Sequence, residues 1–344
     1  MTTGDSTNAS SRPLLEWLLA KYPDTPKKRA KQWITAGRVS VNGVILRQPN
    51  VSIPDPKDAL ELLDRRATAL DCGSSGWQIH PRVAILYLDA ALAIVNKGPG
   101  LLSVPAEPDD LSALSILADF LAGKLRAYDR GVDGRGYSLP PAYRRLEPLP
   151  VHRLDQYTSG VFCMAMNPAA RQRLIDQLKV HSMKREYVAY VEGRPSKPQG
   201  TWRNWLKLSD DQLRQFIVSE ADAKAAGDEA QEAITHYEVV AEFPLGGGRQ
   251  VVTKLRVRLE TGRKHQIRAQ AAHAGFPLVG DRTYHPKYHG DAPKAARIDF
   301  PRQALHAEIL SLDHPDKPDA RMTWTAALPK DLRQLEANLR SGRA

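Results

Sequence analysis

The chain has 344 residues, of which 42% are hydrophobic, and its 49 basic against 39 acidic residues give a formal net charge of +10. That length exceeds one typical domain, so we expect a small and a large domain, and the positive charge favours a polyanionic partner, either nucleic acid or an acidic membrane surface. No apolar run approaches the roughly 20 residues of a membrane span, and the polar N-terminal segment lacks the apolar core of a signal peptide. Composition therefore argues against the membrane-spanning and secreted classes and predicts a cytoplasmic protein in which Cys72 and Cys163 are reduced thiols.

A small domain is predicted over residues 12–64, after a disordered tail at residues 1–11. Pro13 and the apolar spacing behind it predict a short amphipathic helix, and the run 26–34 predicts a second helix. Alternating apolar residues around an Asn-Gly pair in the segment 39–46 predict a β-hairpin with a type I′ turn. Two helices therefore lead into a small sheet.

Six basic residues and no acidic one lie between Pro26 and Arg47. They are Lys27, Lys28, Arg29, Lys31, Arg38 and Arg47. A basic helix beside a basic hairpin is typical of a phosphate-binding surface, although a solvated helix face has the same composition. The two helices and the run 36–43 resemble the small RNA-binding domain named after ribosomal protein S4. That resemblance implies binding to structured RNA, with Lys27, Lys28, Lys31 and Arg38 as the predicted contacts.

The rest of the chain is predicted to form a linker over residues 65–81, a large domain over 82–330 and a C-terminal tail over 331–344. The small residues of the run 72–76 predict a hinge in the linker, because they cannot sustain a buried element. In the large domain we expect a hairpin over 83–95, a helix over 111–126, a surface loop over 129–150, and strands over 188–191, 234–240 and 251–259.

The most informative segment is Val151–Gly160, which sets Asp155 in a polar turn between two apolar segments. Thr158 and the glycine that ends the segment suit a turn that holds a side chain at the mouth of a pocket. A single aspartate in a turn more often bonds its own backbone. Cationic groups at Arg153 and elsewhere favour a functional role, because they can keep a buried carboxylate ionised and oriented.

Two further clusters could contribute to a site. We expect Thr261 to be the N-cap of a helix that runs to about His273, so that Lys264 and Arg268 lie one turn apart on one face. Positive groups would then converge at a helix start, for phosphate binding or for catalysis. Tyr187 heads an apolar strand, where it is either a core aromatic or a ring on which a base stacks.

Together these motifs resemble the RluA-like family of pseudouridine synthases across roughly residues 82–330. Residues 152–160 are similar to the family's H-R-L-D-x-x-T-S-G, residues 184–193 to its tyrosine segment, and residues 261–268 to T-G-R-x-H-Q-I-R. The resemblance implies an α+β fold with a mixed, mainly antiparallel sheet and a central cleft. It implies that Asp155 is the catalytic aspartate, Tyr187 the aromatic against the target base and Arg268 the basic partner of the aspartate, with no metal or cofactor. The predicted substrate contacts in this domain are Arg153, Arg263, Lys264 and His265.

Several alternatives stay open. The aspartate could attack the anomeric carbon of the sugar or abstract a sugar proton toward a glycal. The RNA could be ribosomal or transfer RNA. The small domain favours ribosomal RNA, because an accessory RNA-binding domain suits a large structured RNA. A non-catalytic RNA-binding protein could also have the same fold. A metal hydrolase is disfavoured, because the spacings of His265, His273, His285, His289 and His306 match no ligand frame. We expect a monomer, and segments 129–150 and 195–232 look expanded relative to the family.

Overall fold

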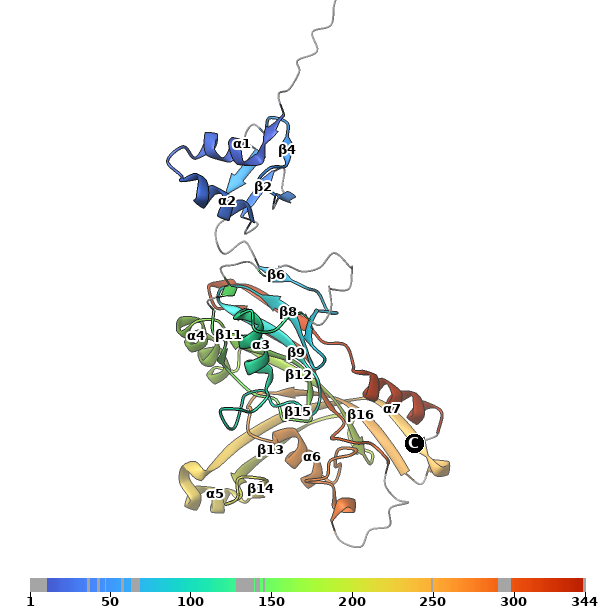
Figure 1. Ribbon diagram of the computed structural model, residues 1–344. Helices are drawn as coiled ribbons and strands as arrows, with labels where there is room; N and C mark the ends of the chain where they lie inside the picture. Colours follow the sequence, from blue (N-terminus) through green and yellow to red (C-terminus); the bar gives the residue numbers. More distant parts are fainter. Residues whose placement is uncertain are drawn as a thin grey trace, which may run out of the picture.

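The computed structural model describes residues 11–35, 38–41, 44–46, 48–56, 59–62, 69–127, 139, 143–144, 146–248, 250–289 and 298–342. Figure 1 shows two bodies, a small one built from the blue N-terminal segments and a larger one built from the rest. The predicted tail up to residue 10, the Asn42-Gly43 turn and most of the predicted loop 129–150 lie outside the described residues.

The small domain packs two helices on a three-stranded sheet. Its elements are β1 (Arg12–Pro13), α1 (Leu14–Lys21), α2 (Lys27–Thr35), β2 (Val39–Val41), β3 (Val44–Leu46), β4 (Ser52–Ile53) and β5 (Leu60–Leu62), with sheet order β3-β2-β5 and a separate β1–β4 pair. Leu14 and Leu18 of α1 and Ile34 of α2 are fully buried in one apolar cluster with residues of β2 and β5. The two predicted helices and the predicted hairpin are confirmed.

The large domain is built on one long sheet, which has 13 strands in the described part of the chain. Its main path runs β14-β13-β15-β16-β12-β17-β11-β9-β8-β6, and β10, β18 and β7 pair beside β11, β17 and β8. The strands are β6 (Leu70–Asp71), β7 (Trp77–His80), β8 (Val83–Leu88), β9 (Leu92–Lys97), β10 (Leu149–Pro150), β11 (Ser159–Ala165), β12 (Lys184–Glu192), β13 (Gln199–Leu208), β14 (Gln215–Val218), β15 (Ala230–Leu245), β16 (Gln250–Leu259), β17 (Leu305–His314) and β18 (Lys317–Thr325). The predicted α+β class with a mainly antiparallel sheet is confirmed.

Helices cover the large sheet on both faces (Figure 1). They are α3 (Ala113–Leu121), α4 (Pro168–Lys179), α5 (Glu220–Ala226), α6 (Gln266–His273) and α7 (Lys330–Arg340). The buried apolar residues of α3 belong to the largest core cluster together with Ile267 and Ala271 of α6. Those of α4 belong to a second cluster and those of α7 to a third. None of the helices in the described residues is long and apolar enough to cross a membrane.

One parallel strand pair interrupts the otherwise antiparallel ladder. β11 runs parallel to β17, with Ser159 opposite His306 and Gly160 opposite Ala307. Gly160 has φ +118° and lies so close to β17 that a Cβ there would overlap the Ala307 carbonyl. Only glycine permits this approach of two backbones. The pair places the start of β11, four residues after Asp155, in the middle of the sheet.

Three predictions about a hinge, a tail and a helix are wrong. The run 72–76 is no hinge, because it connects β6 to β7 and both of these strands pair with β8. Its first residue, Cys72, is buried at 6% exposure. The predicted tail 331–344 contains most of α7, whose leucines at every third or fourth position pack on the sheet. The predicted helix over 111–126 is the shorter α3, which begins after the N-cap Ser112.

Candidate active site

The turn that carries Asp155 connects β10 to β11 and is held by hydrogen bonds to its backbone. Ser103 Oγ donates to the Leu154 carbonyl at 2.8 Å and accepts from the Leu154 N–H at 3.0 Å. Inside the turn, the Thr158 N–H donates to the Asp155 carbonyl at 3.0 Å. The Asp155 side chain therefore projects from a backbone with little freedom to move.

Two buried cations hold the next two carbonyls of the same turn. Lys97, at the end of β9, is 0% exposed and donates through Nζ to the Gln156 carbonyl at 3.0 Å. Arg302 Nη1 donates to the Tyr157 carbonyl at 3.0 Å, while its Nε and Nη2 bond both carboxylate oxygens of Asp331 at 2.7 and 3.1 Å. Burial lowers the pKa of Lys97 to about 7. The position of the turn therefore depends on residues from β9 and from the start of α7.

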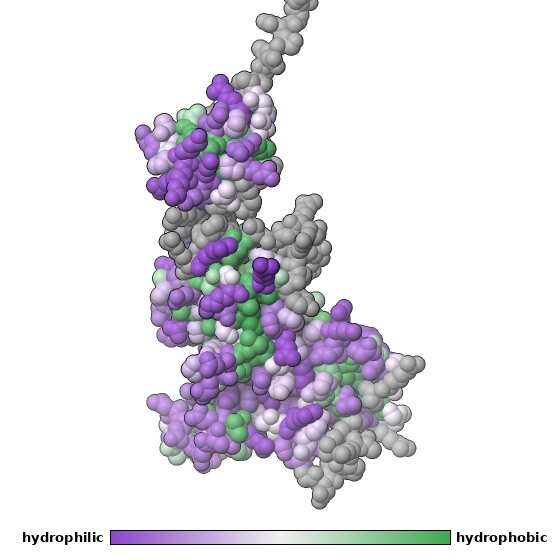
Figure 2. All heavy atoms as spheres, viewed as in Figure 1, coloured by the Kyte–Doolittle hydropathy of each residue, from purple (hydrophilic) through white to green (hydrophobic). Residues whose placement is uncertain are grey.

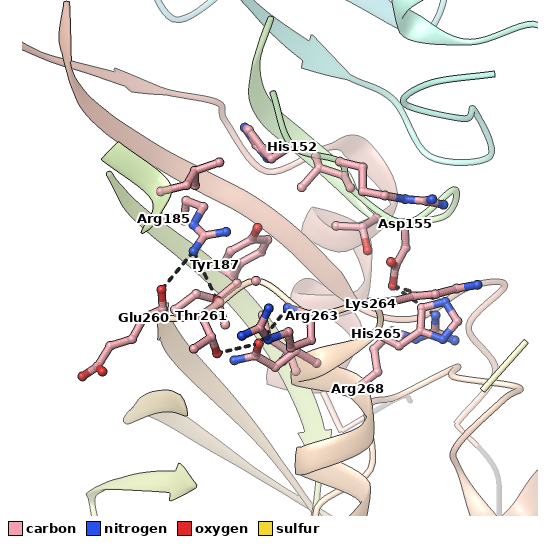
Figure 3. Close-up of a pocket in the computed structure, with 18 of the residues that line it drawn as sticks. His152, Asp155, Arg185, Tyr187, Glu260, Thr261, Arg263, Lys264, His265 and Arg268 are labelled. Carbon is pink, nitrogen blue, oxygen red and sulfur yellow. Dashed lines mark hydrogen bonds and ion pairs between the residues drawn. The ribbon is translucent and has the colours of Figure 1, made fainter. Parts of the chain in front are cut away.

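The carboxylate of Asp155 faces the guanidinium of Arg268 (Figure 3). Arg268 Nη1 donates to Asp155 Oδ2 at 3.0 Å, and its Nε and Nη2 donate to the two carboxylate oxygens of Asp281 at 2.7 and 2.9 Å. Asp281 is 0% exposed. Burial by itself would lower the pKa of Arg268, but hydrogen bonds and attraction to Asp281 and Asp155 raise it above its ordinary value. One carboxylate thus orients a permanently charged arginine toward the other.

The helix α6 begins later than predicted, so Thr261 is not its N-cap. The residue before the helix is His265, which has the left-handed φ of 54° and makes no side-chain cap hydrogen bond. Thr261 Oγ1 instead accepts from the Ile234 N–H at 2.9 Å and donates to Gln266 Oε1 at 2.8 Å. Lys264 therefore lies in the preceding loop, not one helical turn from Arg268, and both side chains still line the same cleft.

His265 links the turn that carries Asp155 to Tyr284. Its Nε2 lies 3.9 Å from Asp155 Oδ2 and its Nδ1 lies 3.1 Å from the Tyr284 hydroxyl. That hydroxyl also accepts from the Gln215 N–H of β14 at 2.7 Å. Burial lowers the pKa of His265 to about 4, so the ring is neutral at pH 7. The segment 195–232, for which we expected an expansion, thus contacts the site through β14.

Tyr187 lies in β12, and its side chain lines the same cleft as that of Asp155 (Figure 3). The side chain is 6% exposed and belongs to the main apolar core. Burial raises the pKa of its hydroxyl, which stays protonated at neutral pH. The first alternative for this ring, a core aromatic, is confirmed, and the ring also forms part of the cleft wall. Stacking of a base on the ring stays a prediction.

The cleft has a volume of about 720 Å³ and brings together every site residue that we predicted in the large domain. They are Arg153, Asp155, Tyr187, Arg263, Lys264, His265 and Arg268. Arg263 is exposed, and its Nε donates to the Glu232 carbonyl at 3.1 Å. Arg153 is exposed as well. The predicted central cleft is therefore present, with cations along its rim and Asp155 inside.

The predicted RNA contacts of the small domain lie outside this cleft. Lys27, Lys28 and Lys31 are exposed on α2, where Figure 2 shows hydrophilic residues gathered on the surface of the small domain. Arg38 is half-buried, with its guanidinium carbon 5.6 Å from the ring centroid of Trp33. The small domain thus presents three exposed lysines on α2 and an arginine over an aromatic ring, two features that suit nucleic acid.

Within the described residues, no group of three or more His, Cys, Asp or Glu side chains is placed to hold a metal ion. The site has one carboxylate with an oriented guanidinium, a buried phenol and several cations around a cleft. This arrangement suits nucleophilic or proton-transfer chemistry by a carboxylate on an anionic substrate.

Three residues that complete the site carried no predicted role, namely Asp281, Lys97 and Arg302. Asp281 had a sequence signal, because the run Val279-Gly280-Asp281 resembles the family segment that follows the arginine helix. Lys97 stands in the run 96–100, which is similar to a family segment with a proline after the lysine, but that similarity predicted no role for it. Arg302 had no signal, since an arginine is exposed far more often than buried and nothing local marks the exception.

Comparisons with known proteins agree with this geometry. Residues 91–273 match the family described as RNA pseudouridylate synthase, and residues 12–58 match the S4 domain. The chain is 31% identical to "Uncharacterized RNA pseudouridine synthase YlyB" of Bacillus subtilis (strain 168), over 97% of this chain and 96% of that protein. It is 30% identical to "Ribosomal large subunit pseudouridine synthase D" of Pseudomonas aeruginosa, over 94% of this chain and 90% of that protein. The solved structure of "Human RNA Pseudouridylate Synthase Domain Containing 4" has the same fold, with a TM-score of 0.51 and 20% identity over 74% of this chain and 92% of that chain.

Proposed function

The chain belongs to the RNA pseudouridylate synthase family, whose members isomerise uridine in RNA, and we propose that its substrate is ribosomal RNA. The relative from Pseudomonas aeruginosa, which covers most of this chain, is named for the large ribosomal subunit. The match of residues 12–58 to an S4 domain supports the same substrate, because a second RNA-binding surface suits a large structured RNA.

The observation that carries the catalytic assignment is the contact of 3.0 Å between Asp155 and Arg268 in the cleft. We assign Asp155 the role of the catalytic carboxylate. It either attacks the anomeric carbon of the target uridine or removes a sugar proton toward a glycal. In both routes the bond from the sugar to uracil N1 breaks, the uracil turns, its C5 bonds to the same anomeric carbon, and the proton of C5 is replaced by one on N1. Arg268 acts as a positioning residue, because Asp281 fixes the guanidinium that holds Asp155.

Tyr187 is assigned to the target base. Chemistry at the anomeric carbon of a nucleotide in structured RNA requires that the nucleotide leave its stack. Tyr187 lies in β12, two strands from β11, which follows the Asp155 turn, and both residues line the cleft. A buried ring in the cleft wall can cover the flipped uracil and keep it in place after the bond breaks. Arg153, Arg263, Lys264 and His265 are assigned to the RNA around that nucleotide.

The small domain, over residues 12–64, is proposed to bind RNA through Lys27, Lys28, Lys31 and Arg38. Exposed lysines contact phosphates without regard to sequence, so this surface contributes affinity while the cleft selects the nucleotide. Because an enzyme of ribosomal RNA works where ribosomes are assembled, we propose that the protein acts in the cytoplasm. We propose that it acts as a monomer, which light scattering during gel filtration tests.

The decisive experiment maps pseudouridine in total RNA from cells that lack the gene and from the same cells that carry the wild-type gene or Asp155→Asn. We expect a site in ribosomal RNA to disappear without the gene, to return with the wild-type gene and to stay absent with the variant. Loss of a site in transfer RNA alone would contradict the proposed substrate. Return of the site with Asp155→Asn would contradict the role of Asp155.

A further inference from the structure

Arg185 lies in the same strand as Tyr187, two residues earlier, and its side chain also lines the cleft (Figure 3). Side chains at alternate positions of a strand point to the same face, and two residues of a strand span roughly 7 Å. A nucleotide whose base lies against Tyr187 therefore brings a neighbouring part of the RNA backbone close to Arg185.

The guanidinium of Arg185 is buried and lacks a carboxylate partner among the described residues. The residue is 8% exposed, and its Nη2 donates to the carbonyls of Glu260 and Thr261, both at 3.2 Å. Its Nε is buried and has no hydrogen-bond partner in the described part of the chain. Burial lowers the pKa of Arg185 below its ordinary value. The positive charge is thus held in the protein without compensation by a nearby anion.

The other buried arginines of the described residues show that this is an exception. Arg268 bonds both oxygens of Asp281, and Arg302 bonds both oxygens of Asp331. A buried charge without a partner costs free energy, which native proteins keep to a few functional positions. Arg185 therefore differs from the two arginines whose role is to fix the protein's own structure.

The chain also leaves space for this side chain in the loop before α6. A Cβ at Gly262 would overlap Arg185 Nη1, so a glycine is required at that position for the guanidinium to lie where it does. The charge of the surroundings favours an anion, because six arginine and lysine side chains line the cleft against three aspartate and glutamate side chains. The net positive charge of the cleft lining around Arg185 therefore favours binding of an anionic ligand.

We propose that Arg185 binds the backbone phosphate of a nucleotide that adjoins the target uridine. This inference rests on the proposed function, since it supplies a second contact for the same RNA. The phosphate provides the missing counter-charge, and the rigid contact of Arg185 with the 260–261 backbone gives the phosphate a fixed position relative to Tyr187 and Asp155. The RNA is thereby held in register at the base and at the adjoining phosphate.

The test uses synthetic RNA fragments that contain the mapped uridine and one neutral methylphosphonate at a time, at each linkage within two nucleotides of it. For the wild-type protein we expect one linkage at which the neutral group raises KM about tenfold, as loss of a hydrogen bond to a charged group does. In Arg185→Met, KM should rise by the same factor with ordinary RNA, and the neutral group at that linkage should add nothing further. The slope of log Kd against log salt should fall by about 0.7. Arg171→Met, which removes an exposed arginine outside the cleft, is the matched control and should leave KM unchanged.

Equal KM values at every neutral linkage in the wild-type protein would overturn the proposal, whether or not the variant folds. Additive effects of Arg185→Met and the neutral linkage would overturn it as well, because they would show that the arginine acts on the loop alone. Failure of the proposed function looks different, since no fragment would then be isomerised by the wild-type protein at all.

Discussion

The small domain and the catalytic cleft both present positive charge, but they hold it in opposite ways. Lys27, Lys28 and Lys31 are exposed on α2, whereas the Arg268 side chain is 6% exposed and bonds two carboxylates. An exposed lysine is a mobile point charge that attracts any phosphate, while a buried arginine with fixed partners presents its donors in one direction only. The comparison separates charge that increases affinity from charge that fixes geometry.

The largest expected effect comes from removing the fixed charge. Arg268→Met should lower kcat by about 10² to 10³-fold, because the group that holds Asp155 is lost. It should also destabilise the fold by about 3–5 kcal/mol, since Asp281 is left buried without its partner. Turnover of the mapped RNA fragment and urea unfolding measure the two quantities.

The matched control is the double variant Arg268→Met with Asp281→Asn. It removes both charges and should recover most of the lost free energy of unfolding while kcat stays low. Recovery of kcat in the double variant, or an unchanged kcat in the single variant, would contradict this role. Either result would show that Arg268 does not fix the geometry of Asp155.

A smaller effect is expected from removing the exposed charge. Replacement of Lys27, Lys28 and Lys31 by glutamine should raise Kd for RNA about tenfold or more at physiological salt and lower the salt slope by about 2–3, with kcat unchanged. Filter binding at several salt concentrations measures this. The control replaces the exposed Lys124, Lys317 and Lys330, which changes the net charge equally outside α2. Equal slopes for the two triple variants would assign the effect to net charge instead of the α2 surface.

At neutral pH the smallest expected effect concerns a half-buried histidine that stays neutral in the folded chain. His152 Nε2 accepts from the Cys163 N–H at 3.2 Å, and burial lowers the pKa of His152 from 6.5 to about 3. At pH values between these two pKa values, His152 is protonated in the unfolded chain but not in the folded chain. The free energy of unfolding therefore falls as the pH falls. His152→Gln should reduce this fall by at most about 1.4 kcal/mol per pH unit.

Urea unfolding between pH 6.5 and pH 4 measures the change, with the exposed His273→Gln as control. Part of the fall should persist in His152→Gln, because burial also lowers the pKa of His265 and of His306 to about 4. A pH dependence identical to that of the wild-type protein would mean that His152 does not titrate differently on folding.

Residue periodicity was enough to predict the two helices and the β2–β3 hairpin of the small domain, and the strands β8, β9, β12, β15 and β16 of the large sheet. It did not predict β11 and β17, which lie in the middle of that sheet. The apolar face of β16, with Leu255 and Val257 buried, follows the alternation visible in the sequence. Hydrogen bonds that join distant segments were not visible in that way. Thr261 is a good N-cap by residue type, but its hydroxyl bonds Ile234 in the neighbouring strand, and α6 begins only at Gln266.

The candidate site shows the same division. Asp155, Tyr187 and Arg268 stand in motifs with a family resemblance, so they could be predicted as partners. Lys97 and Arg302 support the catalytic turn from the ends of other elements, and their burial depends on tertiary contacts that no local pattern encodes. The sequence therefore predicts the groups that stand in motifs better than the buried side chains that hold the turn.

The parallel pairing of β11 with β17 sets a condition on how the enzyme folds. Ser159 lies four residues after Asp155 but contacts His306, at a sequence separation of 147 residues. Contacts between such distant segments form slowly, because a long loop has to close before they are gained. The catalytic turn therefore reaches its final position only after β17 has joined the sheet. Before that step the chain contains all of its sequence motifs but has no assembled active site. We therefore expect catalytic activity to appear in a late, cooperative step of folding.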